Sequence, residues 1–219
     1  ELPNGVPILR LADSTMAKRM GDYLLAVVLF HKRQLLYYTH NPDSTEWGSE
    51  VSIDWNQIGI LGLGFLGQAA SKVFLKMGFK ILGWSRNTKQ IKGVRSFSGN
   101  DGLLEVLNYS DFLINLLPLT PITENLLNKE KLSKMKHRAY LINVGRGKTL
   151  VDKDLIDLLD EGHLSGACLD VFRKEPLSKH HPFRKHKKIL IYKNKRCNLN
   201  FFFTFICKIR IPQVNSKIP

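Results

Sequence analysis

The sequence is poor in cysteine and has no long apolar run. Three cysteines occur among 219 residues, Cys168, Cys197 and Cys207, and their spacing matches neither a metal site nor a disulfide framework. No apolar run has transmembrane length, and no signal-peptide pattern is present. These absences favour a cytoplasmic protein with no bound metal and no membrane partner.

Acidic residues are missing from the C-terminal end. All 19 lie in residues 1–175 against 22 basic residues there, whereas residues 176–219 hold 11 basic residues and no acidic one. The net charge of +14 therefore belongs to that end, and the rest of the chain has the nearly balanced charge of an ordinary enzyme surface. The first residue is Glu1 rather than Met, so we expect the natural chain to start earlier.

One stretch of the sequence combines a strand, a glycine turn and a helix. The apolar run Ile58–Leu61 predicts a buried strand, and apolar residues recur at helical spacing over 66–74. Gly62, Gly64 and Gly67 stand in the Gly-x-Gly-x-x-Gly order of a dinucleotide site. We expect Gly62 to make a tight turn, Gly64 to admit a pyrophosphate, and Gly67 to let helix and strand pack closely. A glycine-rich turn before an ordinary packed helix is the alternative.

The next predicted strand bears on the choice of nucleotide. Residues 80–84 are followed by Ser85 and Arg86, about twenty residues after the first glycine, where NAD sites usually have a carboxylate for the ribose. A hydroxyl and a guanidinium there, with Lys89 close behind, suit a 2′-phosphate instead. A solvated basic turn is the alternative. We therefore predict NADP(H) in preference to NAD(H).

Strand and helix patterns alternate along the rest of the chain. After Arg86 we expect a polar loop, and we expect Asp152 to cap the last helix. The patterns predict strands at 112–117, 139–144, 165–171 and 189–191, and helices at 101–107, 129–135 and 152–159. This alternation predicts an α/β fold, a doubly wound parallel sheet of the Rossmann type.

The residues before the glycine motif divide into three parts. Residues 1–12 are extended and broken by proline. Residues 14–31 predict a helix whose apolar face is so broad that it must be buried on more than one side, against a sheet or a second subunit. Residues 38–56 are polar and predict an exposed arm, with Trp47 and Trp55 as anchors.

Ligands of such sheets lie beyond the carboxyl ends of the strands. The residues there include Pro118, Arg146 and Asp170. Arg146 is the clearest candidate for binding an anion, because the glycines on both sides leave its backbone free to bring a guanidinium into a crevice. A surface ion pair is the alternative for Arg146. For Pro118 a plain strand end is the alternative, and for Asp170 a turn carboxylate.

Five ordered motifs together resemble the D-isomer-specific 2-hydroxyacid dehydrogenases, and most closely the glyoxylate/hydroxypyruvate reductase group of that family. The resemblance covers about residues 5–191. It implies a dinucleotide-binding domain over 13–191 that includes a dimerising helix, and residues 1–12 as the remnant of a substrate domain that is largely missing. The motifs are Gly59–Gly67, Trp84–Arg86, Leu113–Pro118 with Thr120–Pro121, Leu141–Gly147, and Leu169–Phe172 with Glu175–Leu177.

The resemblance implies a cofactor site. In it the backbone of the glycine turn contacts the pyrophosphate, Ser85 and Arg86 hold the 2′-phosphate, and Asp170 binds the nicotinamide carboxamide. The residues implied are Gly62, Gly64, Phe65, Leu66, Gly67, Ser85, Arg86, Leu117, Pro118, Asn143, Val144 and Asp170.

It also implies a catalytic site for reducing a small 2-keto acid, glyoxylate or hydroxypyruvate, in a homodimer. Arg146 would hold the substrate carboxylate and polarise the keto group, and Glu175 would keep a histidine protonated as the acid. At the position of that histidine stands Asn194. His180, His181 and His186 precede the last strand, where we expect a surface loop.

Residues 192–219 form a basic tail without the family's features or any periodicity, and we expect it to be disordered. The resemblance therefore predicts a reductase by descent whose catalytic site is incomplete. The alternative is a catalytically silent NADP(H)-binding or dimerising module. A third hypothesis, a tail that binds nucleic acid or membrane surfaces, has only the tail's basic and aromatic residues in its favour, and we expect neither partner.

Overall fold

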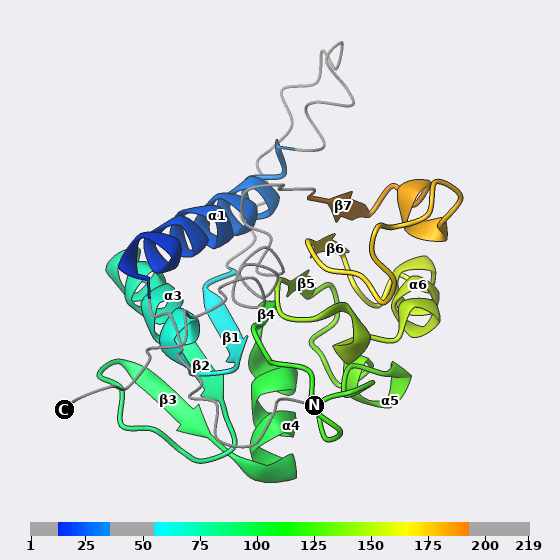
Figure 1. Cartoon of the computed structure of the whole chain (residues 1–219). Coiled ribbons are helices and arrows are strands. Elements are labelled where there is room, and N and C mark those ends of the chain that lie inside the picture. The colour runs from blue at the N-terminus through cyan, green and yellow to red at the C-terminus, as the bar shows by residue number, and fades with distance from the viewer. Residues whose placement is uncertain (1–12, 36–54, 193–219) are drawn as a thin grey trace, which may run out of the picture.

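The computed structural model describes residues 13–35 and 55–192 (Figure 1). A single parallel sheet runs through this part of the chain in the order β3-β2-β1-β4-β5-β6-β7. The order reverses between β1 and β4, which confirms the predicted doubly wound α/β fold. The strands are β1 (Gln57–Leu61), β2 (Lys80–Trp84), β3 (Val94–Phe97), β4 (Phe112–Asn115), β5 (Tyr140–Asn143), β6 (Gly166–Leu169) and β7 (Ile189–Ile191).

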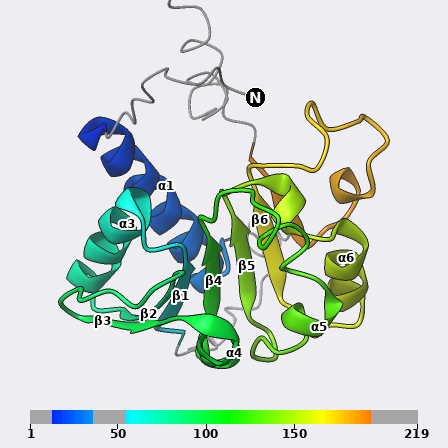
Figure 2. The ribbon, with the colours of Figure 1, turned by 60° about the horizontal axis from the view of Figure 1, so that its bottom comes forward.

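Helices cover both faces of the sheet (Figure 2). Two lie on one face, α1 (Ser14–Lys32) and α3 (Phe65–Lys76), and three on the other, α4 (Gly99–Tyr109), α5 (Lys129–Leu132) and α6 (Asp152–Asp160). Each face has its own apolar core, because the central strands are buried on both sides. Two short 3₁₀ turns, η1 (Gly147–Thr149) and η2 (Pro182–Arg184), complete the described elements. None of the described helices is long and apolar enough to cross a membrane.

Most predicted elements form close to their expected bounds, and two expectations are wrong. The expected loop after Arg86 contains β3, a four-residue edge strand that pairs with β2 and has no continuous apolar run. Asp152 does not cap α6: it is the first helical residue, after the cap Val151, and its carboxylate lies 3.4 Å from His181 Nε2. Both misses occur where neighbouring segments, rather than local pattern, determine the structure.

The predicted helix before the glycine motif is α1. Asp13 caps the amino terminus of this helix, because its carboxylate accepts a hydrogen bond from the Thr15 N–H. The buried face of α1 packs on α3. The two helices are so close that a Cβ at Gly21 of α1 would lie 2.8 Å from the Val73 side chain of α3. Leu24 is buried without solvent exposure. One side of the expected broad apolar face is therefore buried against α3 and the sheet, while residues 1–12, 36–54 and 193–219, with Trp47, lie outside the described residues.

An aromatic cluster closes the amino-terminal edge of the sheet. The His31 ring lies between Trp55, at 5.1 Å, and Tyr140, at 3.8 Å, and its Nε2 is 3.0 Å from Ser165 Oγ. Trp55 therefore anchors the chain as predicted. Burial, helped by the nearby positive charge of Arg138, lowers the pKa of His31 from 6.5 to about 4. The imidazole is thus neutral at physiological pH.

This depressed pKa makes stability depend on pH. As the pH falls from about 6.5 toward about 4, the unfolded chain binds a proton at His31 that the folded chain excludes, so the free energy of unfolding should fall by about 3 kcal/mol. Urea unfolding across this range should show a shallower pH dependence for His31→Gln. The exposed His180 supplies the control His180→Gln, which should keep the wild-type slope; parallel curves for all three proteins would contradict the assignment.

Candidate functional site

The glycine motif forms the turn between β1 and α3. Gly62 adopts a φ of 104°, which L side chains rarely adopt, and its N–H donates to the Trp84 carbonyl at 2.8 Å. A Cβ at Gly67 would overlap the carbonyl oxygen of Gly62, whereas a Cβ at Gly64 would meet no atom within 4 Å. The turn is therefore closed at Gly67 by helix–strand packing and open at Gly64.

The amino terminus of α3 offers donors beside that open position. The first intrahelical bond runs from Gln68 N–H to the Gly64 carbonyl at 2.9 Å, so the N–H groups of Phe65, Leu66 and Gly67 precede it. No acidic residue lies in the first turn, and Phe65 is 48% exposed. Free N–H groups and the positive end of the helix dipole suit a phosphate. The residues present thus fit the pyrophosphate of a dinucleotide.

Ser85 and Arg86 follow β2 directly, next to this turn. The hydrogen bond from Gly62 to Trp84 joins the turn to the end of β2. Ser85 is buried and its hydroxyl donates to the Asn87 carbonyl at 2.7 Å, while Arg86 is exposed. In the described part of the chain no carboxylate forms an ion pair with Arg86. Its charge is therefore available to an anionic group at the ribose end of the site.

The loops after β1, β4, β5 and β6 touch one another at the carboxyl edge of the sheet. A Cβ at Gly62 would lie 3.1 Å from the Leu116 carbonyl oxygen, and one at Gly145 would lie 2.7 Å from that of Leu117. A Cβ at Gly147 would overlap the Phe172 carbonyl carbon. The structure therefore brings the sequence-predicted residues of these loops together at one edge.

Arg146 lies on the loop after β5. It is half-buried, and its Nη1 donates to the Gly145 carbonyl at 2.8 Å. Among the described residues no carboxylate pairs with it, so the alternative of a surface ion pair is not observed. A partly desolvated guanidinium with unused N–H donors favours an anionic ligand.

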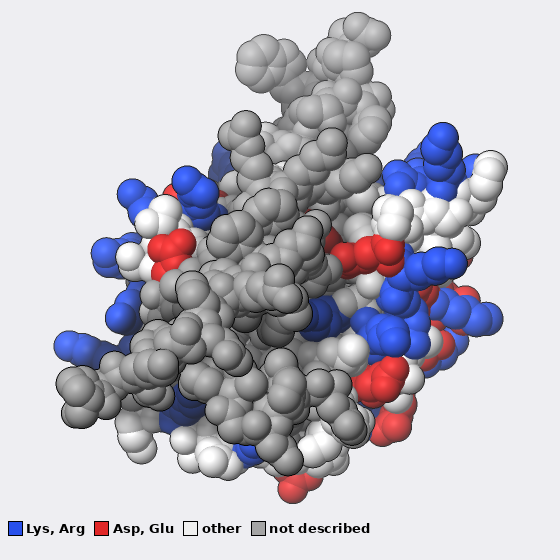
Figure 3. Space-filling view, viewed as in Figure 1, with Lys and Arg blue, Asp and Glu red and all other residues white. Residues whose placement is uncertain are grey.

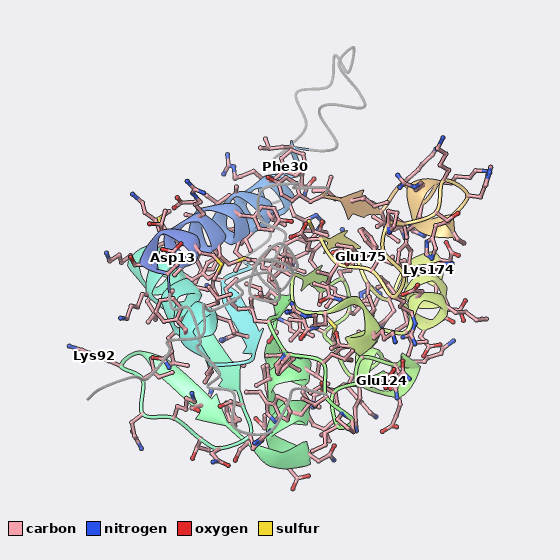
Figure 4. All side chains as sticks on the ribbon, in the orientation of Figure 1. Asp13, Phe30, Lys92, Glu124, Lys174 and Glu175 are labelled. Atoms are coloured by element: carbon pink, nitrogen blue, oxygen red, sulfur yellow. The ribbon has the colours of Figure 1, made fainter. Side chains whose placement is uncertain are left out.

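Asp170 and Glu175 lie on the segment after β6. The Asp170 N–H donates to the Asn143 carbonyl at 3.0 Å, and its carboxylate interacts electrostatically with Cys168. Burial raises the pKa of the Cys168 thiol to about 11, and the charge of Asp170 adds to that effect. The Glu175 Oε1 accepts from the Phe172 N–H at 3.0 Å, within the segment labelled in Figure 4.

Two of the three histidines before β7 face carboxylates of α6. His181 and His186 lie 3.4 and 3.1 Å from carboxylates of α6, those of Asp152 and Asp160, and His180 is exposed. Blue side chains gather at the upper right of Figure 3, on the side of the molecule where this segment lies. The exposed basic residues of the segment are Lys179, Arg184, Lys185, Lys187 and Lys188. Asn194, at the position implied for the acid, lies outside the described residues.

The sequence reasoning singled out Asn143 at this edge but missed the buried polar network to which it belongs. Asn115, Asn143 and Thr149 are fully buried. Asn115 Nδ2 donates to Asn143 Oδ1 at 3.0 Å and to Thr149 Oγ1 at 2.7 Å. The available signal was an asparagine inside each of two apolar runs, since a polar group buried there requires partners.

The sequence model of the D-isomer specific 2-hydroxyacid dehydrogenases, in its NAD binding domain, matches residues 25–192. The chain belongs to this family. The family is the one that the five motifs resemble, and the match ends at the last described residue. The fold, the glycine turn and the order of the motifs are thus all consistent with this family.

Individual 2-hydroxyacid dehydrogenases extend the comparison. Glyoxylate/hydroxypyruvate reductase A of Photorhabdus laumondii is 41% identical over 192 residues, and that of Serratia proteamaculans is 42% identical over 195. Each match covers 87% of this chain and 61% of the relative. The chain therefore spans less than two thirds of the length of these relatives.

Solved structures of 2-hydroxyacid dehydrogenases share the fold. An NADPH-dependent glyoxylate/hydroxypyruvate reductase from Sinorhizobium meliloti, in complex with NADP and sulfate, has a TM-score of 0.81 and 36% identity, covering 87% of this chain and 62% of its own. A 2-hydroxyacid dehydrogenase from Xanthobacter autotrophicus, in complex with NADPH and MES, has a TM-score of 0.80 and 35% identity, covering 85% of this chain and 60% of its own.

A methyl group should destabilise the protein much more at Gly67 than at Gly64. Gly67→Ala should lower the free energy of unfolding by about 3 kcal/mol, because the methyl group overlaps the Gly62 carbonyl. Gly64→Ala, at an ordinary extended conformation in open space, should cost less than about 1 kcal/mol. Urea denaturation of both variants checks this, and equal losses would contradict the geometry.

Proposed function

We propose that this chain is the NADP(H)-binding domain of a reductase for a small 2-keto acid such as glyoxylate or hydroxypyruvate. The observation that carries the proposal is that Ser85 and Arg86 lie next to the open glycine turn. The turn supplies N–H donors for a pyrophosphate, and the residues after β2 supply a cation and a hydroxyl where NAD sites usually carry a carboxylate. The NADP and NADPH bound in the two similar structures support the same cofactor.

We assign different residues of the chain to each part of the cofactor. Backbone N–H groups from Gly64 to Gly67 bind the pyrophosphate. Arg86 binds the 2′-phosphate together with Ser85, whose hydroxyl turns from the Asn87 carbonyl to donate to it. Leu117 and Pro118 line the adenosine side, with Leu117 buried against the core and Pro118 exposed. Asn143 and Val144 border the nicotinamide half, whose carboxamide Asp170 binds. Once bound, the cofactor supplies the hydride.

The proposed chemistry of the chain's own residues is electrostatic. Arg146 holds the substrate carboxylate and stabilises negative charge that develops on the keto oxygen. Its only side-chain bond in the described structure, to Gly145, leaves N–H donors for that task. Glu175 would hold a protonated acid beside it, and its Oε1 is already oriented by the Phe172 N–H.

A catalytically silent module is the second candidate, and Asn194 favours it. An asparagine side chain cannot donate a proton as an imidazolium does, and positioned proton transfer is typically worth about 10²–10⁴-fold in rate. In this form the chain binds NADP(H) without turnover. The ancestry and the cofactor are the same in both candidates, and only turnover distinguishes them.

We also propose that the protein is a homodimer joined through α1. Met16 and Phe30 remain partly exposed on this helix, beside the face that packs on α3 and the sheet. A second copy would cover them. Sedimentation velocity tests this, because a species with the mass of one chain at all concentrations would refute the dimer.

Arg86 should determine the preference between the two nucleotides. Arg86→Ala should weaken NADPH binding about 10- to 100-fold, the range for a lost hydrogen bond to a charged group, and change NADH binding less than about threefold. Fluorescence titration measures both. Lys92→Ala, which removes an exposed cation that points away from the site (Figure 4), serves as the control and should bind both nucleotides like the wild type. Equal losses for NADPH and NADH would contradict a 2′-phosphate contact.

Glyoxylate added after the NADPH titration distinguishes the two candidates. Because Asn194 replaces the acid, we expect binding without oxidation, or oxidation slower than a complete reductase by the roughly 10²–10⁴-fold that proton transfer contributes. Absorbance at the nicotinamide band follows the reaction, with buffer plus NADPH as the control. A full rate would mean that another group supplies the proton. No binding by folded protein would refute the proposed function itself.

A further inference from the structure

Three buried hydrogen bonds at the carboxyl edge of the sheet run in one direction. The Leu117 N–H donates to Asn115 Oδ1 at 3.1 Å, and Asn115 Nδ2 donates to Thr149 Oγ1 at 2.7 Å. The Thr149 hydroxyl in turn donates to the Arg146 carbonyl at 2.6 Å. The chain of bonds therefore starts at the loop after β4 and ends at the loop that carries Arg146.

The direction of these bonds follows from chemistry. A backbone N–H only donates and a backbone carbonyl only accepts, so the two ends of the chain are determined. Asn115 must then face Leu117 with its oxygen and Thr149 with its amide nitrogen, and the Thr149 proton must point to Arg146. Consecutive bonds of this kind polarise and strengthen one another in a buried setting. Asn115 and Thr149 are both fully buried.

The two loops are also joined through the backbone. The Val144 N–H donates to the Asn115 carbonyl at 3.1 Å, and Asn115 stands opposite Asn143 in the register of β4 and β5. Asn143 Oδ1 accepts from both Asn115 and the Gly145 N–H, the latter at 3.3 Å. A Cβ at Gly145 would lie 2.7 Å from the Leu117 carbonyl oxygen. Movement of either loop therefore disturbs the other.

We propose that Asn115 and Thr149 are positioning residues that couple nucleotide binding at Leu117 and Pro118 to anion binding at Arg146. The inference rests on the proposed function, which places a nucleotide on the first loop and a carboxylate on the second. A nucleotide that orders the Leu117 backbone holds Asn115, which holds Thr149 and thereby the backbone of Arg146. Each ligand then prepares the site for the other, and the coupling is reciprocal.

The test is a double titration of the full chain with NADPH and oxamate, a small carboxylate without a reducible ketone. For the wild type, saturating oxamate should lower the Kd for NADPH by about fivefold or more, at the lower end of typical couplings. Thr149→Val should reduce this effect to less than about twofold, with the Kd for NADPH alone within about threefold of wild type. Thr149→Ser, which retains the hydroxyl, should restore the coupling.

Ser110→Ala is the matched control. Ser110 is also fully buried and donates to a backbone carbonyl, that of Val106, but it follows α4 and precedes the opposite end of β4. It should keep the wild-type coupling. If Thr149→Val does not fold, Asn115→Leu and Thr149→Ala take its place and should lose the coupling.

The outcomes separate the two proposals. Coupling retained without the Thr149 hydroxyl, or lost equally in Ser110→Ala, would overturn the positioning role. NADPH binding by the wild type without any effect of oxamate would overturn the coupling while leaving the cofactor proposal intact. Failure of the folded wild type to bind NADPH would refute the proposed function and the coupling with it.

Discussion

The close approach of two backbones at Gly62 and Gly67 is the constraint on which the carboxyl edge of the sheet depends. The first turn of α3 rests on the Gly62 carbonyl, at a distance that leaves no room for a Cβ on Gly67. This contact places α3 N–H groups above the end of β1, and Gly62 in turn bonds to the end of β2. A larger residue at Gly67 would separate helix and strand, and the phosphate donors would lose their place beside Ser85 and Arg86.

The same edge shows how a parallel sheet brings distant residues together. Because β1, β4, β5 and β6 run in one direction, their following loops meet on one side. Contact there is close enough that Gly145 and Gly147 leave no space for side chains against neighbouring backbone. Polar groups buried between the loops must then bond to one another. Asn115, Thr149 and the Asn143 oxygen meet that requirement and connect loops that carry different parts of the proposed site, while Asn143 Nδ2 has no partner among the described residues.

Two guanidinium groups at this edge have no carboxylate partner among the described residues. They belong to Arg146 and Arg86. A protein that leaves guanidinium groups without carboxylates beside open N–H donors is arranged for anionic ligands. The family membership is consistent with this arrangement, while the chain spans 61% of its curated relatives.

The sequence alone determined the fold class, most element positions and the residues at the strand ends, because apolar runs, helical spacing and glycine turns are local signals. It also indicated Arg86 and Arg146 through the residue types at those positions. Only the tertiary structure determined the features that depend on contacts between segments distant in the sequence. Strand β3 forms only because β2 offers it an edge, and Asp152 pairs with His181 rather than capping α6. The roles of Asn115 and Thr149 depend on two loops meeting across 34 residues of sequence, a contact that only the parallel packing of β4 and β5 creates.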